Sequence, residues 1–299
     1  MSRRARILAC GILALQLAGA APAGAGSPVH HRQVADAQRV RAYWTPARMA
    51  AARPVEELAG PVAYRASALR GGFLSAPAPA PAAPPYPANG KVFFRLGGAG
   101  YFCSAAIVDA PSARLVWTAA HCVRDPGRNG KWAGRWVFVP GYDQGARPYG
   151  SWPAVDLWID SSWIRNNDNG DFAAAVIGRR NGMNVQAAVG ASYTLGTKPV
   201  RNQEWEAVGY PADAVFDDLM WHCVSNFHHT DRSGPRRPGP LPFGIGCDMS
   251  GGSSGGPWLA ENGRLGAITS YGYPARPNLL FGTYLGDWAR KLYRSVRNR

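Results

Sequence analysis

From Lys91 onward, the chain alternates between short apolar runs and clusters of Gly, Pro, Asn and Asp. The runs are rich in Val, Ile, Phe, Tyr and Trp, which favour strands. Many short strands with regular turn signals are typical of an all-β sandwich or barrel, so we predict an all-β domain. Its strands are expected at residues 91–96, 101–109, 114–120, 135–142, 171–178, 205–211, 263–273 and 281–286.

The pattern changes at both ends of this domain. Residues 285–299 place Trp288, Leu292 and Val296 at helical spacing, which predicts a C-terminal helix. Residues 27 to about 75 are polar and Arg-rich, with weak helical periodicity. We interpret them as a separate segment ahead of the all-β domain.

Residues 75–90, SAPAPAPAAPPYPANG, join the two parts. A stretch this rich in Pro and Ala is not expected to pack a core, and it is predicted to run extended as a linker. The alternative is a disordered arm of the mature protein. We therefore divide the chain into a signal peptide at 1–26, a pro-segment with its linker at 27–88, and the main domain at 89–299.

The start of the chain has the layout of a secretory signal. Residues 2–6 are basic, residues 7–17 are apolar, and small residues follow up to residue 25. The apolar stretch is too short to anchor the chain in a bilayer, and no later run approaches the ~20 residues of a spanning helix. We expect a secreted, extracellular protein with no membrane association after signal cleavage.

Four cysteines follow the signal: Cys103, Cys122, Cys223 and Cys247. An even number of cysteines in an exported chain indicates two disulfides, but three pairings are possible and the sequence alone does not choose between them. No metal site is expected, because the His and Cys residues at 222–229 do not have the spacing of a standard zinc site.

The chain carries 33 Lys and Arg residues against 19 Asp and Glu residues, a formal net charge of +14. This charge is explained either by the codon usage of a GC-rich genome or by attraction to an acidic polymer, such as a cell wall. The arginines are dispersed and the sequence contains no nucleic-acid-binding motif, so no nucleic-acid partner is expected.

The stretch CDMSGGSSGGPW, residues 247–258, surrounds two adjacent serines with glycines. Such a run is either a flexible linker or a tight turn that exposes one hydroxyl and directs backbone N–H groups at one point. Serine is a weak nucleophile, so the second interpretation needs a base within reach. His121 is the candidate, because it ends an apolar run beside Cys122 in the stretch TAAHC.

TAAHC at residues 118–122 and GSSGGP at residues 252–257 resemble the histidine and serine motifs of the trypsin/chymotrypsin-like serine proteases. AVGYP at residues 207–211 is similar to the V8-like branch of secreted bacterial enzymes. The resemblance covers about residues 88–290. It implies a fold of two six-stranded antiparallel β-barrels, followed here by the C-terminal helix, and an enzyme without a cofactor.

The resemblance also implies a role for each residue of the site. Ser254 is the nucleophile, His121 is the general base, and the backbone N–H groups of Gly252 and Ser254 form the oxyanion hole. The carboxylate that orients His121 is expected between the two motifs. Asp171 resembles the family's acid because it directly precedes an apolar run, and Asp168 is the second candidate.

Substrate-binding residues are implied in the same way. Ser270, Tyr271 and Gly272 resemble the strand edge that pairs with a substrate backbone. Asp248 lies six residues before Ser254, which resembles the position of the Asp at the base of the trypsin pocket. The alternative for Asp248 is a turn residue that faces solvent.

Two further implications concern the disulfides and activation. In this family the cysteine beside the catalytic His pairs with one on the preceding strand, which implies Cys103–Cys122 and leaves Cys223–Cys247. Ser253 stands where trypsin-like zymogens have an Asp that receives a new N-terminal ammonium. A hydroxyl cannot form that ion pair, so we expect a zymogen that is activated instead by removal of its pro-segment during export.

Together these features predict a secreted, monomeric serine endopeptidase that hydrolyses peptide bonds of proteins or peptides through an acyl-enzyme intermediate. The alternative is a non-catalytic protein on the protease fold that binds a polyanion or a cell wall. An esterase that uses the same residues is a third alternative.

Overall fold

The computed structural model describes residues 26–59, 74–80, 82–196, 198–234 and 237–299. The signal peptide predicted at residues 1–26 lies outside the described residues, except for Gly26. Within the described ranges, no helix combines the length and the apolar character that crossing a membrane requires.

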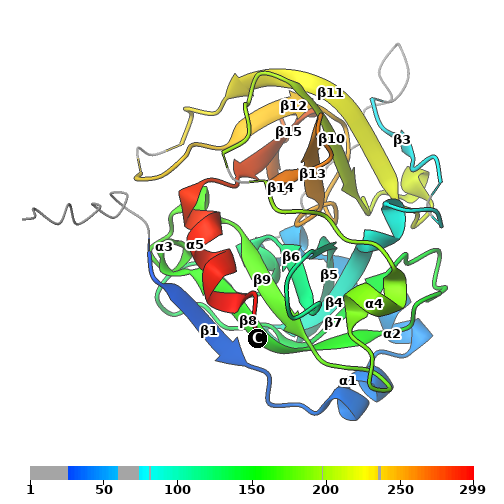
Figure 1. Ribbon diagram of the computed structural model, residues 1–299. Helices are drawn as coiled ribbons and strands as arrows, with labels where there is room; N and C mark the ends of the chain where they lie inside the picture. The colour runs from blue at the N-terminus through cyan, green and yellow to red at the C-terminus, as the bar shows by residue number, and fades with distance from the viewer. Residues whose placement is uncertain (1–25, 60–73, 81, 197, 235–236) are drawn as a thin grey trace, which may run out of the picture.

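Two antiparallel β-barrels form the body of the molecule, and they lie one above the other in Figure 1. The lower, first barrel has the strand order β8-β7-β4-β5-β6-β9 and closes because β9 also pairs with β8. Its strands are β4 (Asn89–Leu96), β5 (Ala99–Val108), β6 (Leu115–Thr118), β7 (Gly134–Pro140), β8 (Trp152–Asp160) and β9 (Ala173–Ile177).

The second barrel has the strand order β10-β13-β14-β15-β12-β11 and closes because β11 also pairs with β10. Its strands are β10 (Glu204–Gly209), β11 (Trp221–Thr230), β12 (Phe243–Gly246), β13 (Pro257–Ala260), β14 (Leu265–Tyr273) and β15 (Arg276–Tyr284). The predicted all-β fold of two six-stranded antiparallel barrels is therefore confirmed.

Large aromatic side chains fill the interior of each barrel. In the first barrel Trp117 stacks on Phe172 with ring centres 6.0 Å apart. In the second barrel Phe243 contacts both Trp205 and Trp258, at 5.0 Å and 5.2 Å between ring centres. All five side chains are fully buried, so the barrels form a rigid support for the loops between them.

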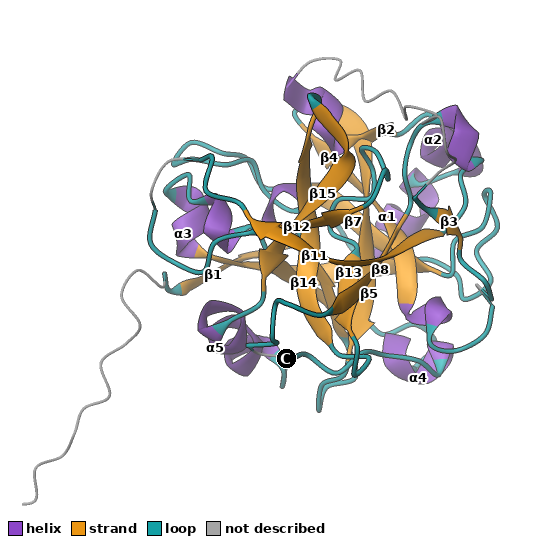
Figure 2. Ribbon diagram, turned by 90° about the horizontal axis from the view of Figure 1, so that it is seen from above, coloured by secondary structure: helices purple, strands orange, loops and turns teal. Residues whose placement is uncertain are grey.

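Short helices lie around the periphery of the strands (Figure 2). The predicted C-terminal helix is present as α5 (Asp287–Val296), which buries Trp288, Leu292 and Val296 and packs against β8 and β9. The remaining helices are α1 (Ala37–Tyr43), α2 (Pro46–Ala50), α3 (Ser161–Ile164) and α4 (Val185–Val189), with 3₁₀ turns η1 (Val55–Ala59), η2 (Tyr86–Ala88), η3 (Ala120–Cys122), η4 (Asp168–Gly170) and η5 (Ala214–Phe216).

Residues 26–59 form a layer on the first barrel, drawn in blue in Figure 1. β1 (Pro28–Arg32) pairs antiparallel with the second half of β8, and β2 (Arg53–Pro54) pairs parallel with β5. Between them, Trp44 is buried, and its Nε1 donates a hydrogen bond to the carbonyl oxygen of Arg135 at 2.7 Å. The segment predicted to be a pro-segment is thus attached to the domain at several points.

The stretch predicted to be a linker packs against the domain. β3 (Ala76–Pro77) pairs with β11, and Ala78 and Ala88 are buried. The expectation that residues 75–90 pack no core is therefore wrong for their described part. Ala and Pro side chains carry no polar atoms, so a sheet edge can cover them without removing a polar side chain from water.

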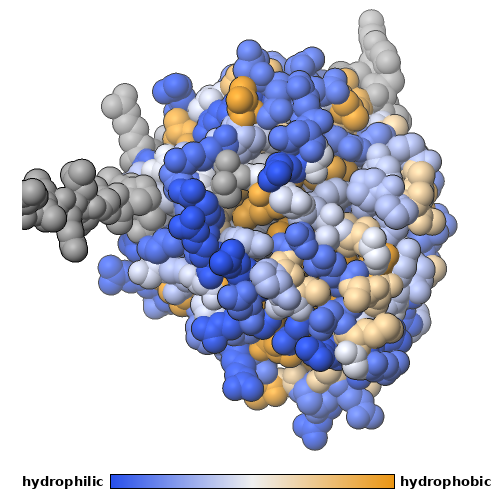
Figure 3. Space-filling model, in the orientation of Figure 1, coloured by the Kyte–Doolittle hydropathy of each residue, from blue (hydrophilic) through white to orange (hydrophobic). Residues whose placement is uncertain are grey.

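Hydrophilic side chains cover most of the face drawn in Figure 3, with smaller apolar areas between them. The apolar side chains lie mainly inside the barrels, and their removal from water stabilises the fold.

We predict that Trp44→Ala in the full chain lowers the free energy of unfolding by about 3–5 kcal/mol, which is typical of truncating a buried Trp. The substitution removes the contact with Phe93, at 5.7 Å between ring centres, and leaves the Arg135 carbonyl without its donor. Urea denaturation measures the change. The control is Val34→Ala, because Val34 is 94% exposed. Equal denaturation midpoints for Trp44→Ala and the wild-type chain would contradict the stabilising role of this layer.

Candidate active site

His121 and Asp171 meet because the strands beside them pair. His121 follows β6 in η3, and Asp171 lies two residues before Ala173, which pairs with Thr118 between β9 and β6. Nδ1 of His121 lies 2.8 Å from Oδ2 of Asp171, and the backbone N–H of His121 donates to Oδ1 at 3.0 Å. The carboxylate therefore determines both the position and the orientation of the ring.

Asp171 is buried, and it accepts a third hydrogen bond from the hydroxyl of Ser270 on β14. A buried carboxylate needs such donors, because an unpaired charge is costly inside a protein. Sequence reasoning placed Ser270 in substrate binding, but the structure directs its side chain to Asp171. Ser270 thus links the second barrel to the His121–Asp171 pair of the first.

The pKa of His121 is raised above its usual value. Burial alone would lower this pKa, and the side chain is only 18% exposed. The charge and hydrogen bond of Asp171, together with weaker attractions to Glu56 and Asp168, outweigh the effect of burial on this pKa. The ring consequently loses its proton at a higher pH than a histidine in water.

Asp168, the second candidate for the orienting acid, lies in η4 and lines the same cleft as His121. Burial raises the pKa of Asp168, and the neighbouring charge of Asp171 raises it further. The ring nitrogen Nδ1 of His121 bonds to Asp171, so the geometry favours Asp171 in this position.

The loop that carries Ser254 is tightly folded, and two of its glycines have positive φ, Gly252 at 92° and Gly255 at 82°. A Cβ atom on Gly252 would lie 2.4 Å from the ring of Phe102, and one on Gly255 would lie 2.3 Å from the carbonyl oxygen of Ser104. Both the backbone conformation and the lack of space therefore require glycine. This finding supports the tight-turn interpretation of the Gly-rich stretch.

Ser104 on β5 holds this loop in place from the first barrel. Its hydroxyl donates to the carbonyl of Gly252 and accepts from the backbone N–H of Tyr210, both at 2.9 Å. Its backbone N–H donates to the carbonyl of Ser254 at 2.8 Å. Sequence reasoning missed Ser104, because nothing in its local pattern distinguishes it from any other small strand residue.

Two disulfides flank the site, Cys103–Cys122 and Cys223–Cys247. This is the pairing implied by the family resemblance. The first joins β5 to the turn that holds His121, and the second joins β11 to the loop that leads to Ser254. The sulfur atoms of Cys103 and Cys122 lie close to the His121 ring, but their disulfide leaves no thiolate for a metal.

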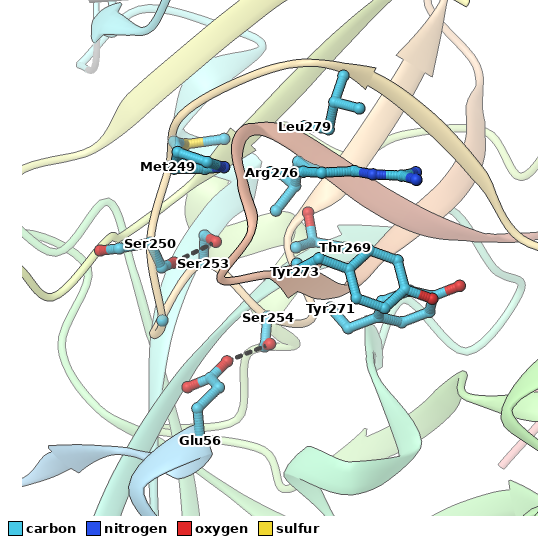
Figure 4. A pocket seen from close by; sticks show the side chains of 14 residues that line it. Glu56, Met249, Ser250, Ser253, Ser254, Thr269, Tyr271, Tyr273, Arg276 and Leu279 are labelled. Carbon is cyan, nitrogen blue, oxygen red and sulfur yellow. Dashed lines mark hydrogen bonds between the residues drawn. The ribbon is translucent and has the colours of Figure 1, made fainter. Parts of the chain in front are cut away.

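Ser254 is hydrogen-bonded to Glu56, a residue that sequence reasoning did not consider (Figure 4). The Ser254 hydroxyl donates to Oε1 of Glu56, and the backbone N–H of Gly252 donates to Oε2 at 3.0 Å. Nε2 of His121 is buried and has no hydrogen-bond partner among the described residues. His121 and Asp171 line one cleft and Ser254 lines a second, and Glu56 lines both, with the Ser254 hydroxyl bonded to its carboxylate.

A pocket opens beside Ser254, with the side chains shown in Figure 4. Its lining includes Met249, Thr269, Tyr271, Gly272, Tyr273, Arg276 and Leu280. In Figure 4 the side chain of Arg276 extends along the side of the pocket opposite Glu56. Tyr271 and Gly272, predicted to bind substrate, therefore lie next to the Ser254 loop.

Asp248 does not line this pocket. It is buried, and its two oxygens accept hydrogen bonds from the backbone N–H groups of Leu74 and Ser75, at 3.0 Å and 2.9 Å. The structure therefore supports neither the pocket-base position nor the solvent-exposed turn for this residue. The six-residue spacing from Ser254 did not predict the position of Asp248, because its side chain is directed to the backbone of residues 74–75.

Tyr271 and Gly272 lie on the part of β14 that extends past β13. β13 pairs with β14 only as far as Ile268, whereas Tyr271 and Gly272 pair with β15. The hydroxyl of Tyr271 donates to Asp231 at 2.7 Å. This arrangement is compatible with an added strand on the side of Ser254.

Comparison with solved structures gives similar proteins, although no protein-family model matches the chain. The chain is similar to the thermostable serine protease AL20 from an extremophilic microorganism, with 36% sequence identity, a TM-score of 0.65, and coverage of 71% of this chain and 97% of that chain. It is also similar to the protease Anisep from Arthrobacter nicotinovorans, with 34% identity, a TM-score of 0.64, and coverage of 71% and 95%.

Among curated proteins, 109 residues are 31% identical to a glutamyl endopeptidase from Bacillus licheniformis. The match covers 36% of this chain and 33% of that protein, so the chain spans about a third of the length of this relative. A solved Glu endopeptidase, at 17% identity and a TM-score of 0.59, shares the fold.

We predict that Asp171→Asn lowers the pKa of His121, because it removes the negative charge that opposes the effect of burial. NMR titration of the His121 ring measures the change. Asp168→Asn is the control and should lower the pKa by less, since Asp168 makes the weaker attraction. An unchanged or higher His121 pKa in Asp171→Asn would contradict the assignment.

Proposed function

Because the chain belongs to the trypsin/chymotrypsin-like serine proteases, we propose that it is a serine endopeptidase with Ser254 as its nucleophile. The observation that carries the proposal is the His121–Asp171 pair, hydrogen-bonded at 2.8 Å in a cleft that is also lined by Glu56, the partner of the Ser254 hydroxyl. The substrate is a peptide bond of a protein or peptide, and the residues act without a cofactor.

In the proposed reaction, Oγ of Ser254 attacks the carbonyl carbon of the substrate while Nε2 of His121 takes the hydroxyl proton. The imidazolium that forms is stabilised by Asp171, whose carboxylate stays ionised. His121 then passes the proton to the leaving amine, the C–N bond breaks, and an ester of Ser254 remains. Water, deprotonated by His121, attacks this ester and releases the acid product and Ser254.

The backbone N–H groups of Gly252 and Ser254 are proposed to stabilise the oxyanion of the tetrahedral intermediate. Support comes from the Gly252 N–H, which already donates to a negatively charged oxygen of Glu56 at 3.0 Å. A donor fixed in this direction by a tightly folded loop needs no reorganisation when charge develops. Removal of one such donor lowers kcat by about 10²–10³-fold in enzymes of this kind.

We also propose export of the chain and a pro-segment that includes residues 26–59. The signal-like start and the two disulfides support export, since disulfides persist in oxidising compartments. The position of Glu56 at Ser254 supports the pro-segment. A non-catalytic binding protein on this fold remains the alternative, and the labelling experiment below separates the two.

The pocket beside Ser254 supports a preference for an acidic residue before the scissile bond. Arg276 lines the pocket, and Asp248, which would have attracted a basic side chain, lies elsewhere. A positive charge at the pocket attracts Glu and repels Lys or Arg. The name of the glutamyl endopeptidase relative agrees with this proposal.

We predict that a fluorophosphonate probe labels the secreted, processed protein at Ser254. Ser254→Ala should abolish labelling, because the nucleophile is gone. Ser253→Ala should retain it, since the Ser253 hydroxyl donates to the carbonyl of Ser250 at 2.6 Å inside the loop. Fluorescence of the labelled band measures the result. Absence of labelling in correctly processed wild-type protein would favour the binding-protein alternative.

We predict that kcat/KM is at least about tenfold higher for peptides with Glu than for matched peptides with Lys before the scissile bond, a difference of about 1.4 kcal/mol. Arg276→Ala should reduce this ratio, because it removes the positive charge that lines the pocket. Arg294→Ala, an exposed change on α5, is the control. A ratio below one in the wild-type enzyme would overturn the proposed preference.

A further inference from the structure

The N-terminal segment enters the active site through one side chain. η1 follows β2, which pairs with β5, and this anchor brings Glu56 to the Ser254 loop. Its two carboxylate oxygens have different partners, the hydroxyl of Ser254 and the backbone N–H of Gly252. The segment therefore interacts with the same atoms that the proposed reaction uses.

We propose that residues 26–59 are a built-in inhibitor in which the Glu56 carboxylate occupies the place of the carboxylate of a cleaved peptide. This inference rests on the proposed function. The acid product of peptide hydrolysis leaves a carboxylate at Ser254, with one oxygen toward the oxyanion donors and one toward the nucleophile. Glu56 reproduces this arrangement from a side chain, and Figure 4 shows its bond to Ser254.

The contact blocks the reaction in two ways. The Ser254 proton is donated to Glu56, so it is not donated to Nε2 of His121, which has no partner among the described residues. The Gly252 N–H is occupied by an anionic oxygen and is not free for a substrate carbonyl. A carboxylate is also resistant to attack by a nucleophile, so Glu56 holds Ser254 without being consumed.

Neighbours of Glu56 cover the rest of the cleft. Val55 and Leu58 line the same hollow as His121 and Trp163. Val55 is buried there, whereas Leu58 is 42% exposed. A peptide substrate that approaches His121 would have to displace this turn.

The anchors of the segment explain how a single carboxylate is held firmly. β1 pairs along β8, and Trp44 is buried with its Nε1 bonded to Arg135. These anchors and β2, all of which precede Glu56 in the chain, keep its carboxylate at a high effective concentration beside Ser254, so an individually weak contact is populated. Residues 26–59 contact the first barrel along β8 and β5, and the Glu56 carboxylate contacts Ser254 and Gly252.

The test uses the full uncleaved chain and the rate at which a fluorophosphonate labels Ser254. Glu56→Ala should raise this rate by about tenfold or more, the equivalent of one hydrogen bond to a charged group. Glu56→Gln, which keeps the size and removes the charge, should raise it by a smaller factor. Labelling is measured on the band of the uncleaved chain, so that processing during the assay does not contribute.

The matched control is Glu57→Gln. Glu57 is the neighbouring acid, and its carboxylate lies 3.7 Å from the guanidinium of Arg53 on the same segment. The labelling rate of this variant should stay within about twofold of the wild-type rate, since surface ion pairs contribute little. Thermal unfolding of each variant shows whether the segment stays folded.

The outcomes separate this inference from the proposed function. Equal labelling rates of the wild-type chain and Glu56→Ala overturn the inhibitory role of Glu56. Labelling of Ser254 in either chain still supports the proposed serine endopeptidase function. If only processed protein is labelled and no full-length variant reacts, another part of the segment is the inhibitor and the role of Glu56 is overturned. If neither form is labelled, the proposed function fails, and the inhibitory role fails with it.

Discussion

The buried carboxylate of Asp171 is the interaction on which the rest of the site depends. Its donors come from both barrels, the backbone and ring of His121 from the first and the hydroxyl of Ser270 from the second. An unpaired charge at this position would be strongly destabilising, so the two barrels are held in the one arrangement that satisfies it. The orientation of His121 and the closeness of the Ser254 loop follow from that arrangement.

The sequence predicts the parts of the structure that depend on local patterns. β9 is a continuous apolar run, β4 contains the apolar stretch VFF, and α5 shows helical spacing, so all three were predictable. β11 was missed because it alternates with polar residues in WHCVSNFHHT, and β13 because PWLA is short. The motifs around His121 and Ser254 were recognisable because tight turns demand particular residues.

The contacts that Glu56 and Ser104 make with the Ser254 loop were not predictable. Glu56 lies 198 positions before Ser254, and Ser104 lies 148 positions before Gly252, so no local pattern connects them. Asp248 was misplaced by counting along the chain, because its partners are backbone groups 173 and 174 positions away. Such pairs are created by the docking of whole elements, and only the folded chain shows them.

Removal of residues 26–59, as proposed, would have one further consequence for the sheet edge that β1 covers. β7 pairs with β8 only at Trp152 and Pro153, and β1 covers the edge of β8 from Asp156 to Asp160. Loss of the segment exposes this edge, and bare strand edges promote aggregation between molecules. Asp156, at one end of this stretch, is bonded to His30 of β1, and without that partner its carboxylate repels the same edge of a second copy. The edge therefore carries its own protection against self-association once the covering strand is gone.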